Sequence, residues 1–255
     1  MIEVKHLTRR YGSTLAVDDV SFSVERGAIC GLLGPNGAGK STTMNIMTGC
    51  LAATDGEVRY DGLEIYADKD QVKRRIGYLP EQPPLYGDMT VWEYLDFVAR
   101  AKGLPRLQVT EEVKRTGFAC GLEEVIGRPI KNLSKGYKQR VGIAQALIGD
   151  PDVVILDEPT VGLDPIQIIE IRDLVKRLGK RHTVIVSSHI LSEIRALCDR
   201  IVIISKGRVV ADDTYSGENV VWRQPDSAIF SRSDSSTSSV CEGKLKIMST
   251  LSESK

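Results

Sequence analysis

The sequence predicts an α/β fold with a mostly parallel β-sheet, because short apolar strands alternate with helical segments along most of its 255 residues. The apolar runs at 28–33 and 153–156 are typical of buried parallel strands. Between about Thr90 and Gly149 the alternation gives way to helical periodicity alone. We therefore expect helices on both faces of one sheet, with a helical segment inserted into it. No internal repeat is visible, so we expect one such module.

Other segments complete the alternation. Residues 2–7 and 20–25 alternate apolar and polar side chains, as half-buried strands do. Further strands and helices are expected at 56–62, 76–80, 166–178, 183–187, 190–197 and 201–204. Inside the helical stretch, apolar residues recur at helical spacing in two stripes: Val91, Tyr94, Leu95 and Val98, then Ile143, Ala144, Leu147 and Ile148.

A glycine-rich loop between the run 28–33 and a following helix carries the first chemical signal. Its residues fit the phosphate-binding pattern GxxxxGK(S/T): Gly34, Pro35, Asn36, Gly37, Ala38, Gly39, Lys40, Ser41 and Thr42. Glycines let the backbone N–H groups curl inward as an anion nest, at the positive end of the helix. Lys40 would reach the β- and γ-phosphates of a nucleotide, and the Ser41 hydroxyl would ligate Mg²⁺. A helix is expected to continue through Met47, with Gly49 as its C-cap.

A second signal is the apolar strand 153–156, which ends in two acids, Asp157 and Glu158. Ligands of open α/β sheets bind at the carboxyl ends of the strands, where these acids would lie. Asp157 is suited to hold Mg²⁺, directly or through water. Glu158 can then polarise a water in line with the γ-phosphate. The alternative is that Glu158 merely caps the next helix, but the phosphate loop favours the catalytic role.

Composition excludes several function classes. Lys plus Arg and Asp plus Glu both number 34, so the formal net charge is zero and bulk electrostatics favour no nucleic-acid partner. The start of the chain is no signal peptide, and no apolar run approaches the roughly 20 residues that span a bilayer. The cysteines are odd in number and form no CxxC pair, which indicates reduced thiols in the cytosol: Cys30, Cys50, Cys120, Cys198 and Cys241.

The stretch 133–140, LSKGYKQR, lies just upstream of the strand that ends in Asp157 and resembles the signature sequence of ABC (ATP-binding cassette) ATPases. Residues 2 to about 213 are similar to that family's nucleotide-binding domain in motif order and spacing. The resemblance implies a P-loop NTPase core of the RecA-like type, with an N-terminal antiparallel β subdomain and an inserted helical subdomain. It also implies the core at 1–85 and 151–215 and the helical subdomain at 86–150.

By this resemblance, two copies pair head to tail and each ATP lies between one phosphate loop and the opposite signature. Ser134 and the backbone of Gly136 would touch the γ-phosphate bound by the partner. The positive end of the helix that starts there supports this, although Ser134 also fits a plain helix N-cap.

The resemblance assigns roles to further residues. Tyr11 would stack on adenine, the alternative being an apolar edge residue. Gln82 would contact Mg²⁺ and the attacking water, at the hinge to the helical subdomain. His189 would be the switch histidine that contacts the γ-phosphate, where a lone histidine is otherwise structural. The segment 162–165 would touch its mate across the dimer, and in isolation it is a turn that opens a helix.

Two departures from the family pattern stand out. Lys135 and Tyr137 occupy positions where the usual signature has glycine and glutamine. This variant resembles the branch that serves exporter-type permeases, and the lysine could add charge near the triphosphate. The chain after about 213 does not resemble the family's continuation. The serine-rich run at 231–239 favours a disordered tail over 216–255, although 220–222 could still pack on the core. The sequence does not decide whether residues 216–255 are a genuine tail or an aberrant end.

The resemblance implies an ATPase subunit that works as a homodimer, with ATP and Mg²⁺, on a separate integral membrane permease. Such a subunit would lie in the cytoplasm, on the inner face of the cell membrane. Export is favoured over import by the signature variant alone, and the sequence names neither the substrate nor the permease. One alternative is a soluble ABC-type ATPase that acts on nucleic acid or ribosomes, but coiled-coil insertions, tandem cassettes and basic extensions are missing here. A regulatory module without turnover is the other, and Glu158 and His189 argue against it.

Overall fold

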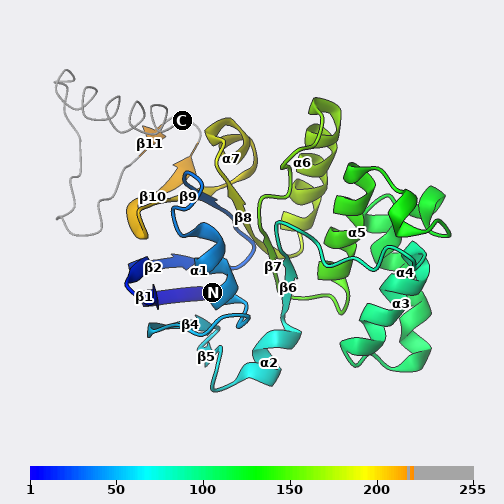
Figure 1. Cartoon of the computed structure of the whole chain (residues 1–255), viewed down its shortest axis with the longest axis horizontal. Coiled ribbons are helices and arrows are strands. Elements are labelled where there is room, and N and C mark those ends of the chain that lie inside the picture. Colours follow the sequence, from blue (N-terminus) through cyan, green and yellow to red (C-terminus); the bar gives the residue numbers. More distant parts are fainter. Residues whose placement is uncertain (217–218, 221–255) are drawn as a thin grey trace.

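Alternating residues at the start of the chain form strands, as their period predicted, and these strands pair in the antiparallel sheet that the resemblance implied. The computed structural model describes residues 1–216 and 219–220 (Figure 1). The strands of this sheet pair in the order β2–β1–β4–β5. Their bounds are β1 (Ile2–Tyr11), β2 (Thr14–Val24), β4 (Asp55–Tyr60) and β5 (Leu63–Glu64).

The apolar strands form the second sheet, in the order β11–β10–β9–β3–β8–β7–β6. From β6 to β9 every neighbouring pair is parallel, and β10 and β11 continue the sheet antiparallel. The predicted α/β fold with a mostly parallel sheet is thus confirmed. The bounds are β3 (Ile29–Leu33), β6 (Ile76–Leu79), β7 (Val153–Leu156), β8 (Thr183–Ser188), β9 (Arg200–Ser205), β10 (Arg208–Ser216) and β11 (Asn219–Val220).

Helices cover the parallel sheet, and α3 to α5 form the predicted helical insertion between β6 and β7 (Figure 1). The α-helices are α1 (Lys40–Met47), α2 (Lys69–Arg74), α3 (Val91–Ala101), α4 (Arg106–Ala119), α5 (Lys135–Leu147), α6 (Pro165–Gly179) and α7 (Leu191–Leu197). Short 3₁₀ turns lie at Glu123–Val125 and Ile130–Asn132. The subdomain division at residues 86 and 150 remains a prediction.

The sequence did not predict β10, although it follows β9 through a two-residue turn. Lys206 and Gly207 in this turn have φ of 49° and 80°, as hairpin turns that match strand twist require. The strand was missed because acids interrupt its apolar pattern, among them Asp212 and Asp213. The serine-rich run at 231–239 and residues 221–222 lie outside the described residues.

The parallel sheet is buried on both faces, which explains its continuous apolar strands. In β7, Val154 and Leu156 join the core with α3 to α7, whereas Val153 and Ile155 join the core with α1 and the antiparallel sheet. Successive side chains of a strand point to opposite faces, so one strand serves two cores. Within residues 1–216 and 219–220, no helix has the length and apolar character needed to cross a membrane.

The helical insertion is held against the sheet edge at Gly77 in β6. A Cβ atom built there would lie 2.1 Å from the carbonyl oxygen of Ala146 in α5. Any larger residue would push α5 away, so glycine lets the helix approach the strand. This contact sets the position of α5, whose first turn carries the signature stretch.

The cysteines whose side chains the structure describes are free thiols, as the sequence indicated. Cys30, Cys120 and Cys198 are buried, and Cys50 is exposed. Burial raises the pKa of the Cys30 and Cys120 thiols to about 12, so both stay protonated at neutral pH. Cys241 lies outside the described residues.

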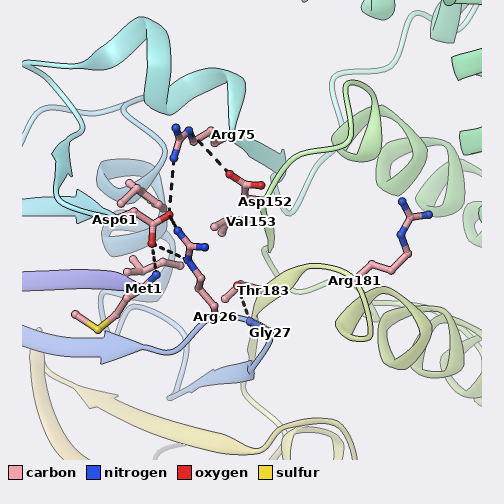
Figure 2. A pocket seen from close by; sticks show the side chains of 11 residues that line it. Met1, Arg26, Gly27, Asp61, Arg75, Asp152, Val153, Arg181 and Thr183 are labelled. Atoms are coloured by element: carbon pink, nitrogen blue, oxygen red, sulfur yellow. Dashed lines mark hydrogen bonds and ion pairs between the residues drawn. The ribbon is translucent and has the colours of Figure 1, made fainter.

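A cavity of about 200 Å³ lies at the amino ends of the parallel strands, opposite the phosphate loop. Apart from Arg181, its charged groups pair with one another (Figure 2). Asp61, in the turn between β4 and β5, binds the α-ammonium of Met1 and, at 2.8 Å, the guanidinium of Arg26. Arg75 lies 3.8 Å from Asp61 and 3.9 Å from Asp152. This network joins the two sheets and neutralises the chain's amino terminus.

The Asp61 network predicts an acid-sensitive contribution to stability. The hydrogen bond from Arg26 is the largest cause that holds the pKa of Asp61 below its ordinary value of 3.8. Because the pKa of Asp61 is lower in the folded state than in the unfolded state, its ionised form stabilises the fold at pH values above 3.8. This stabilisation is lost as the pH falls through the folded-state pKa. Asn tolerates the φ of 51° at this position, so Asp61→Asn removes the charge with little backbone strain.

We expect Asp61→Asn to lower the thermal midpoint at pH 7, and the gap to wild type to shrink below about pH 4 as the wild-type carboxyl becomes protonated. Thermal unfolding between pH 3 and 8 measures both. The exposed Asp173→Asn, in the middle of α6 (Pro165–Gly179), serves as control and should track wild type throughout. An unchanged gap at pH 3 would contradict the assignment.

Candidate functional site

The phosphate loop joins β3 to α1 and is built as its glycines predicted. Gly37 and Gly39 have φ of 77° and 109°, in the left-handed region that glycine adopts freely. Gly39 forms the N-cap of α1, and a Cβ atom there would lie 2.7 Å from the carbonyl oxygen of Ala16. The first N–H groups of α1 therefore face the loop, which gives it the positive potential of a helix start. The C-cap of α1 is Thr48 and not Gly49 as predicted; Gly49 follows it with a φ of 66°, the left-handed conformation common just after a helix.

Lys40 lies inside this loop, and only 5% of its surface is exposed. Its ammonium donates hydrogen bonds to the carbonyl oxygens of Gly34 at 2.7 Å and Pro35 at 3.3 Å. It also lies 3.2 Å from Oε1 of Glu158, which is 6% exposed. The structure thus joins the loop lysine to the acid after β7, two residues that are more than a hundred positions apart in the sequence.

Glu158 is the centre of the site. Its Oε2 lies 2.9 Å from Nδ1 of His189, which follows β8. Its Oε1 is buried and, within the part of the chain that the structure describes, accepts no hydrogen bond; the Lys40 contact meets the distance for an ion pair only. Glu158 has a φ of 47°, a conformation that costs energy for a side chain other than glycine and is concentrated at functional sites. Asp164, not Glu158, caps α6, so the capping alternative does not apply.

Asp157 lies beside it and is held by a residue that sequence reasoning missed. The Ser187 hydroxyl donates to Oδ1 of Asp157 at 2.6 Å and accepts the Glu158 N–H at 2.8 Å. Ser187 is fully buried at the end of β8. Its only signal in the sequence was a polar residue at the end of an apolar strand, which does not separate a positioning role from an ordinary strand end.

The other proposed metal ligands come from separate elements. Ser41 is half-buried on α1, and Gln82 is exposed in the loop after β6. No group of three or more His, Cys, Asp or Glu side chains that could hold a metal occurs within residues 1–216 and 219–220. An Mg²⁺ site here would therefore use one carboxylate, neutral oxygens and substrate phosphates, as Mg²⁺ sites at nucleotides usually do.

Tyr11 lies at the end of β1 and is 46% exposed. The guanidinium of Arg9 stacks on its ring, 4.7 Å from the ring centroid. Exposure of the ring fits an adenine-stacking aromatic and an apolar edge residue alike, so the role of Tyr11 stays a prediction.

The signature stretch begins α5, where Ser134 is the N-cap and accepts the N–H of Tyr137 at 3.3 Å. Among the described residues, no hydrogen bond or ion pair joins the stretch 133–140 to the phosphate loop. Figure 1 shows α5 and α1 on either side of strands β6 to β8. One chain thus keeps its two predicted ATP-binding motifs apart.

Two contacts that were not expected join the signature to the segment after Glu158. The amide of Gln167 in α6 lies 2.7 Å from where a Cβ atom of Gly136 would be. The ammonium of Lys135 lies 2.0 Å from the corresponding position of Gly162, whose φ is 68°. Each glycine is covered by the flexible end of a long side chain from the opposite segment, and at Gly162 the positive φ is what favours glycine. Lys135 therefore lies against residue 162 of its own chain in this conformation.

A buried acid at the carboxyl edge of a parallel sheet, facing a phosphate loop, defines a P-loop nucleotide triphosphatase. The family model that matches residues 17–161 of the chain is described as ABC transporter. The chain is 40% identical over 223 residues to the uncharacterized ABC transporter ATP-binding protein YhcH of Bacillus subtilis, covering 86% of this chain and 72% of that protein.

Other relatives agree. The lantibiotic transport ATP-binding protein SrtF of Streptococcus pyogenes is 37% identical, over 85% of this chain and 92% of that protein. The dimeric structure of MJ0796, a bacterial ABC transporter cassette, matches with a TM-score of 0.77 and 27% identity, over 85% of this chain and all of that one. A post-hydrolysis dimer of the same cassette, bound to ADP and phosphate, matches with a TM-score of 0.76 and 26% identity, over 85% and 100% of the two chains.

The chain belongs to the ABC transporter family, as an ATP-binding and ATP-hydrolysing subunit.

The hydrogen bonds of Ser187 lead to a prediction about the free energy of unfolding. Ser187→Ala would leave the buried Glu158 N–H without its acceptor, which costs about 1–3 kcal/mol. We expect chemical unfolding to report a loss of that size. The matched control is Ser192→Ala on α7, which removes an exposed hydroxyl and should change the free energy of unfolding by less than about 0.5 kcal/mol. Equal effects of the two variants would contradict the structural assignment of Ser187.

Proposed function

We propose that this subunit forms a head-to-tail homodimer that closes around two ATP molecules and drives a separate membrane permease of the export type. The observation that carries the catalytic part is Glu158, a buried carboxylate with one unbonded oxygen, placed between Lys40 and His189. In this proposal the subunit works at the cytoplasmic face of the membrane, bound there through its permease.

Hydrolysis needs a water, a base and a stabilised γ-phosphate. Glu158 accepts a proton from the water while the water oxygen bonds to the γ-phosphorus. The bond from that phosphorus to the β,γ-bridging oxygen breaks, which gives ADP and inorganic phosphate. Lys40 exchanges its contacts with the loop carbonyls for the β- and γ-phosphates, and this frees Glu158 for the water. His189 holds the carboxylate through Oε2 and faces the γ-phosphate.

The donor set fits Mg²⁺, which Ser41, Gln82 and Asp157 would hold together with the phosphates. The bound ion supplies neutralising charge on the phosphates and orients them. Asp157 is suited because it is buried and its Oδ1 is fixed by Ser187. This hydrogen bond restricts the orientation of the carboxylate.

Closure in trans is supported by the separation of the two motifs within one chain. A phosphate bound by residues 34–42 of one copy would meet the α5 start of the other, with Ser134 and the backbone of Gly136 nearest to it. Tyr11 would stack on adenine with its exposed ring. The similarity to cassettes solved as dimers supports the same arrangement.

An exposed aromatic group supports a permease-docking surface near Gln82. Tyr86 is 53% exposed and packs edge-on against Phe97, with ring centroids 5.6 Å apart and an exposed fraction of 44% for Phe97. It also meets the buried ring of Tyr94, 6.0 Å away. The segment 83–92 and α3 thus present rigid apolar rings, as interface anchors do. An apolar helix of the permease is the occupant that we propose.

The direction of transport is proposed from the signature variant and from the relatives. SrtF and BcrA, from Bacillus licheniformis, are transport ATP-binding proteins for a lantibiotic and for bacitracin; BcrA is 39% identical over 83% of this chain and 69% of that protein. YbhF of Escherichia coli carries the description of a probable multidrug transporter subunit. We propose export of an antibiotic or drug of this kind.

The central prediction concerns Glu158→Gln. The amide cannot accept the water's proton, so turnover should fall by about a hundredfold or more, while MgATP still binds. The closed dimer should then accumulate, and light scattering with ATP present should report twice the monomer mass. Phosphate release measures turnover.

The matched control is Lys40→Ala, which removes the phosphate contact and should weaken ATP binding as well as turnover. Wild-type hydrolysis by Glu158→Gln would exclude Glu158 as the base. Unchanged ATP affinity of Lys40→Ala would exclude the proposed role of that lysine.

The partner is tested with tagged Glu158→Gln and MgATP in gently solubilised native membranes. We expect a polytopic membrane protein to be recovered, and its recovery to fall several-fold when Tyr86→Ala and Phe97→Ala are added, because apolar anchors dominate such interfaces. Phe118→Ala, an exposed aromatic on α4 outside the cluster, should recover the partner normally. Recovery of ribosomes or nucleic acid alone would instead favour the soluble alternative.

A further inference from the structure

Glu193 is a buried acid that the catalytic assignment leaves unexplained. It lies in the first turn of α7 and is 8% exposed. A buried carboxylate costs several kcal/mol unless hydrogen bonds compensate it, so its partners indicate what it does.

Two hydroxyl groups donate hydrogen bonds to the same carboxylate oxygen of Glu193. Oε2 of Glu193 accepts a hydrogen bond from the Thr160 hydroxyl at 2.8 Å and another from the Ser188 hydroxyl at 3.0 Å. The Ser188 oxygen accepts in turn the N–H of Ile190 at 3.0 Å. Thr160 and Ser188 are themselves buried, so neither hydroxyl has ready access to water.

These two hydroxyls flank the catalytic pair. Thr160 follows Glu158 by two residues, and Ser188 directly precedes His189. One carboxylate oxygen therefore joins the segment that carries the base to the segment that carries the histidine. The two serines at the end of β8 bind different acids, because Ser187 donates to Asp157 whereas Ser188 donates to Glu193.

The helix that carries Glu193 is itself anchored to the phosphate-loop strand. Ile194 packs so tightly on β3 that a Cβ atom at Gly31 would lie 2.5 Å from its Cγ2 atom. Gly31 precedes the loop residue Gly34 by three positions. The carboxylate is thus fixed relative to the same strand that positions Lys40.

We propose that Glu193 is a positioning residue that sets the spacing between Glu158 and His189 for ATP hydrolysis. The inference rests on the roles proposed above for that pair. The 2.9 Å contact between the two side chains depends on two loops, and a hydrogen-bonded tie between loops restricts their relative motion. Loss of the tie should slow the chemical step and leave ATP binding, which occurs at the phosphate loop, nearly unchanged.

The test uses the full-length chain and steady-state hydrolysis of MgATP with Thr160→Val, Glu193→Ala and Glu193→Gln. Thr160→Val keeps the shape and removes one donor, and Glu193→Ala removes the shared acceptor. We expect both to lower kcat by about tenfold or more and to change KM by less than about twofold, as for a misplaced catalytic group. Glu193→Gln keeps one carbonyl oxygen for both hydroxyls and should retain more activity than Glu193→Ala.

Combining the two substitutions provides a second readout. Because both interrupt one tie, the double variant Thr160→Val with Glu193→Ala should be no slower than Glu193→Ala alone. Independent effects on stability would instead add. Ile65→Val is the matched control, since Ile65 is fully buried in the core beside the antiparallel sheet, and the change lowers stability by about 0.5–1.5 kcal/mol without touching α7 or either hydroxyl. Its kcat per folded molecule should equal that of wild type.

The inference is overturned if Thr160→Val and Glu193→Ala keep wild-type kcat while Glu158→Gln is inactive. It is also overturned if Ile65→Val loses kcat to the same degree, because the effect would then be loss of stability alone. A failure of the proposed function is seen separately, because Glu158→Gln would then hydrolyse ATP at the wild-type rate and both assignments would fall together.

Discussion

The ion pair between Lys40 and Glu158 is the interaction on which the site depends, and both partners are almost completely buried. Moving two charges out of water is expensive, so such a pair persists only where the surrounding structure fixes both groups and supplies further hydrogen bonds. Lys40 donates hydrogen bonds to carbonyl oxygens of the phosphate loop, and His189 forms a hydrogen bond with Glu158. The pair is therefore a product of the sheet that brings the three segments to one edge.

Strand order provides that edge. Between β3 and β7 lies β8, so the carboxyl ends of three adjacent parallel strands carry the phosphate loop, His189 and Glu158. Adjacent parallel strands lie about 4.8 Å apart, which puts side chains from their ends within contact range. The two apolar cores on either face keep this sheet rigid. The strained φ of Glu158 is tolerated because packing on both faces and the hydrogen bond from its N–H determine its backbone.

The helical insertion contacts the same edge of the sheet through close packing. α5 reaches β6 at Gly77, and its first turn exchanges two contacts with the segment after Glu158, through Gly136 and Gly162. At Gly77 the contact is backbone against backbone, and such close-packed contacts deform little, so β6 and α5 keep a fixed relative position.

Local patterns in the chain were enough to predict the fold class, the order of most strands and helices, and the helical insertion. They also identified Lys40, Asp157 and Glu158 as candidates, whereas His189 was a candidate through the resemblance to ABC ATPases. The fold follows from the two periodicities of hydrophobic residues, and the candidates follow from residue types whose chemistry is carried by short spacing. The antiparallel strand β10 was missed, because polar residues interrupt its pattern.

What holds these residues in place is visible only in the folded chain. Ser187, Thr160 and Glu193 act through partners about thirty positions away, and hydrogen-bond geometry across strands leaves no periodic trace in a sequence. The same is true of the contact that places Lys135 on Gly162. Local patterns therefore identified the reacting groups, and the long-range packing of the sheet and α7 determined the distances between those groups.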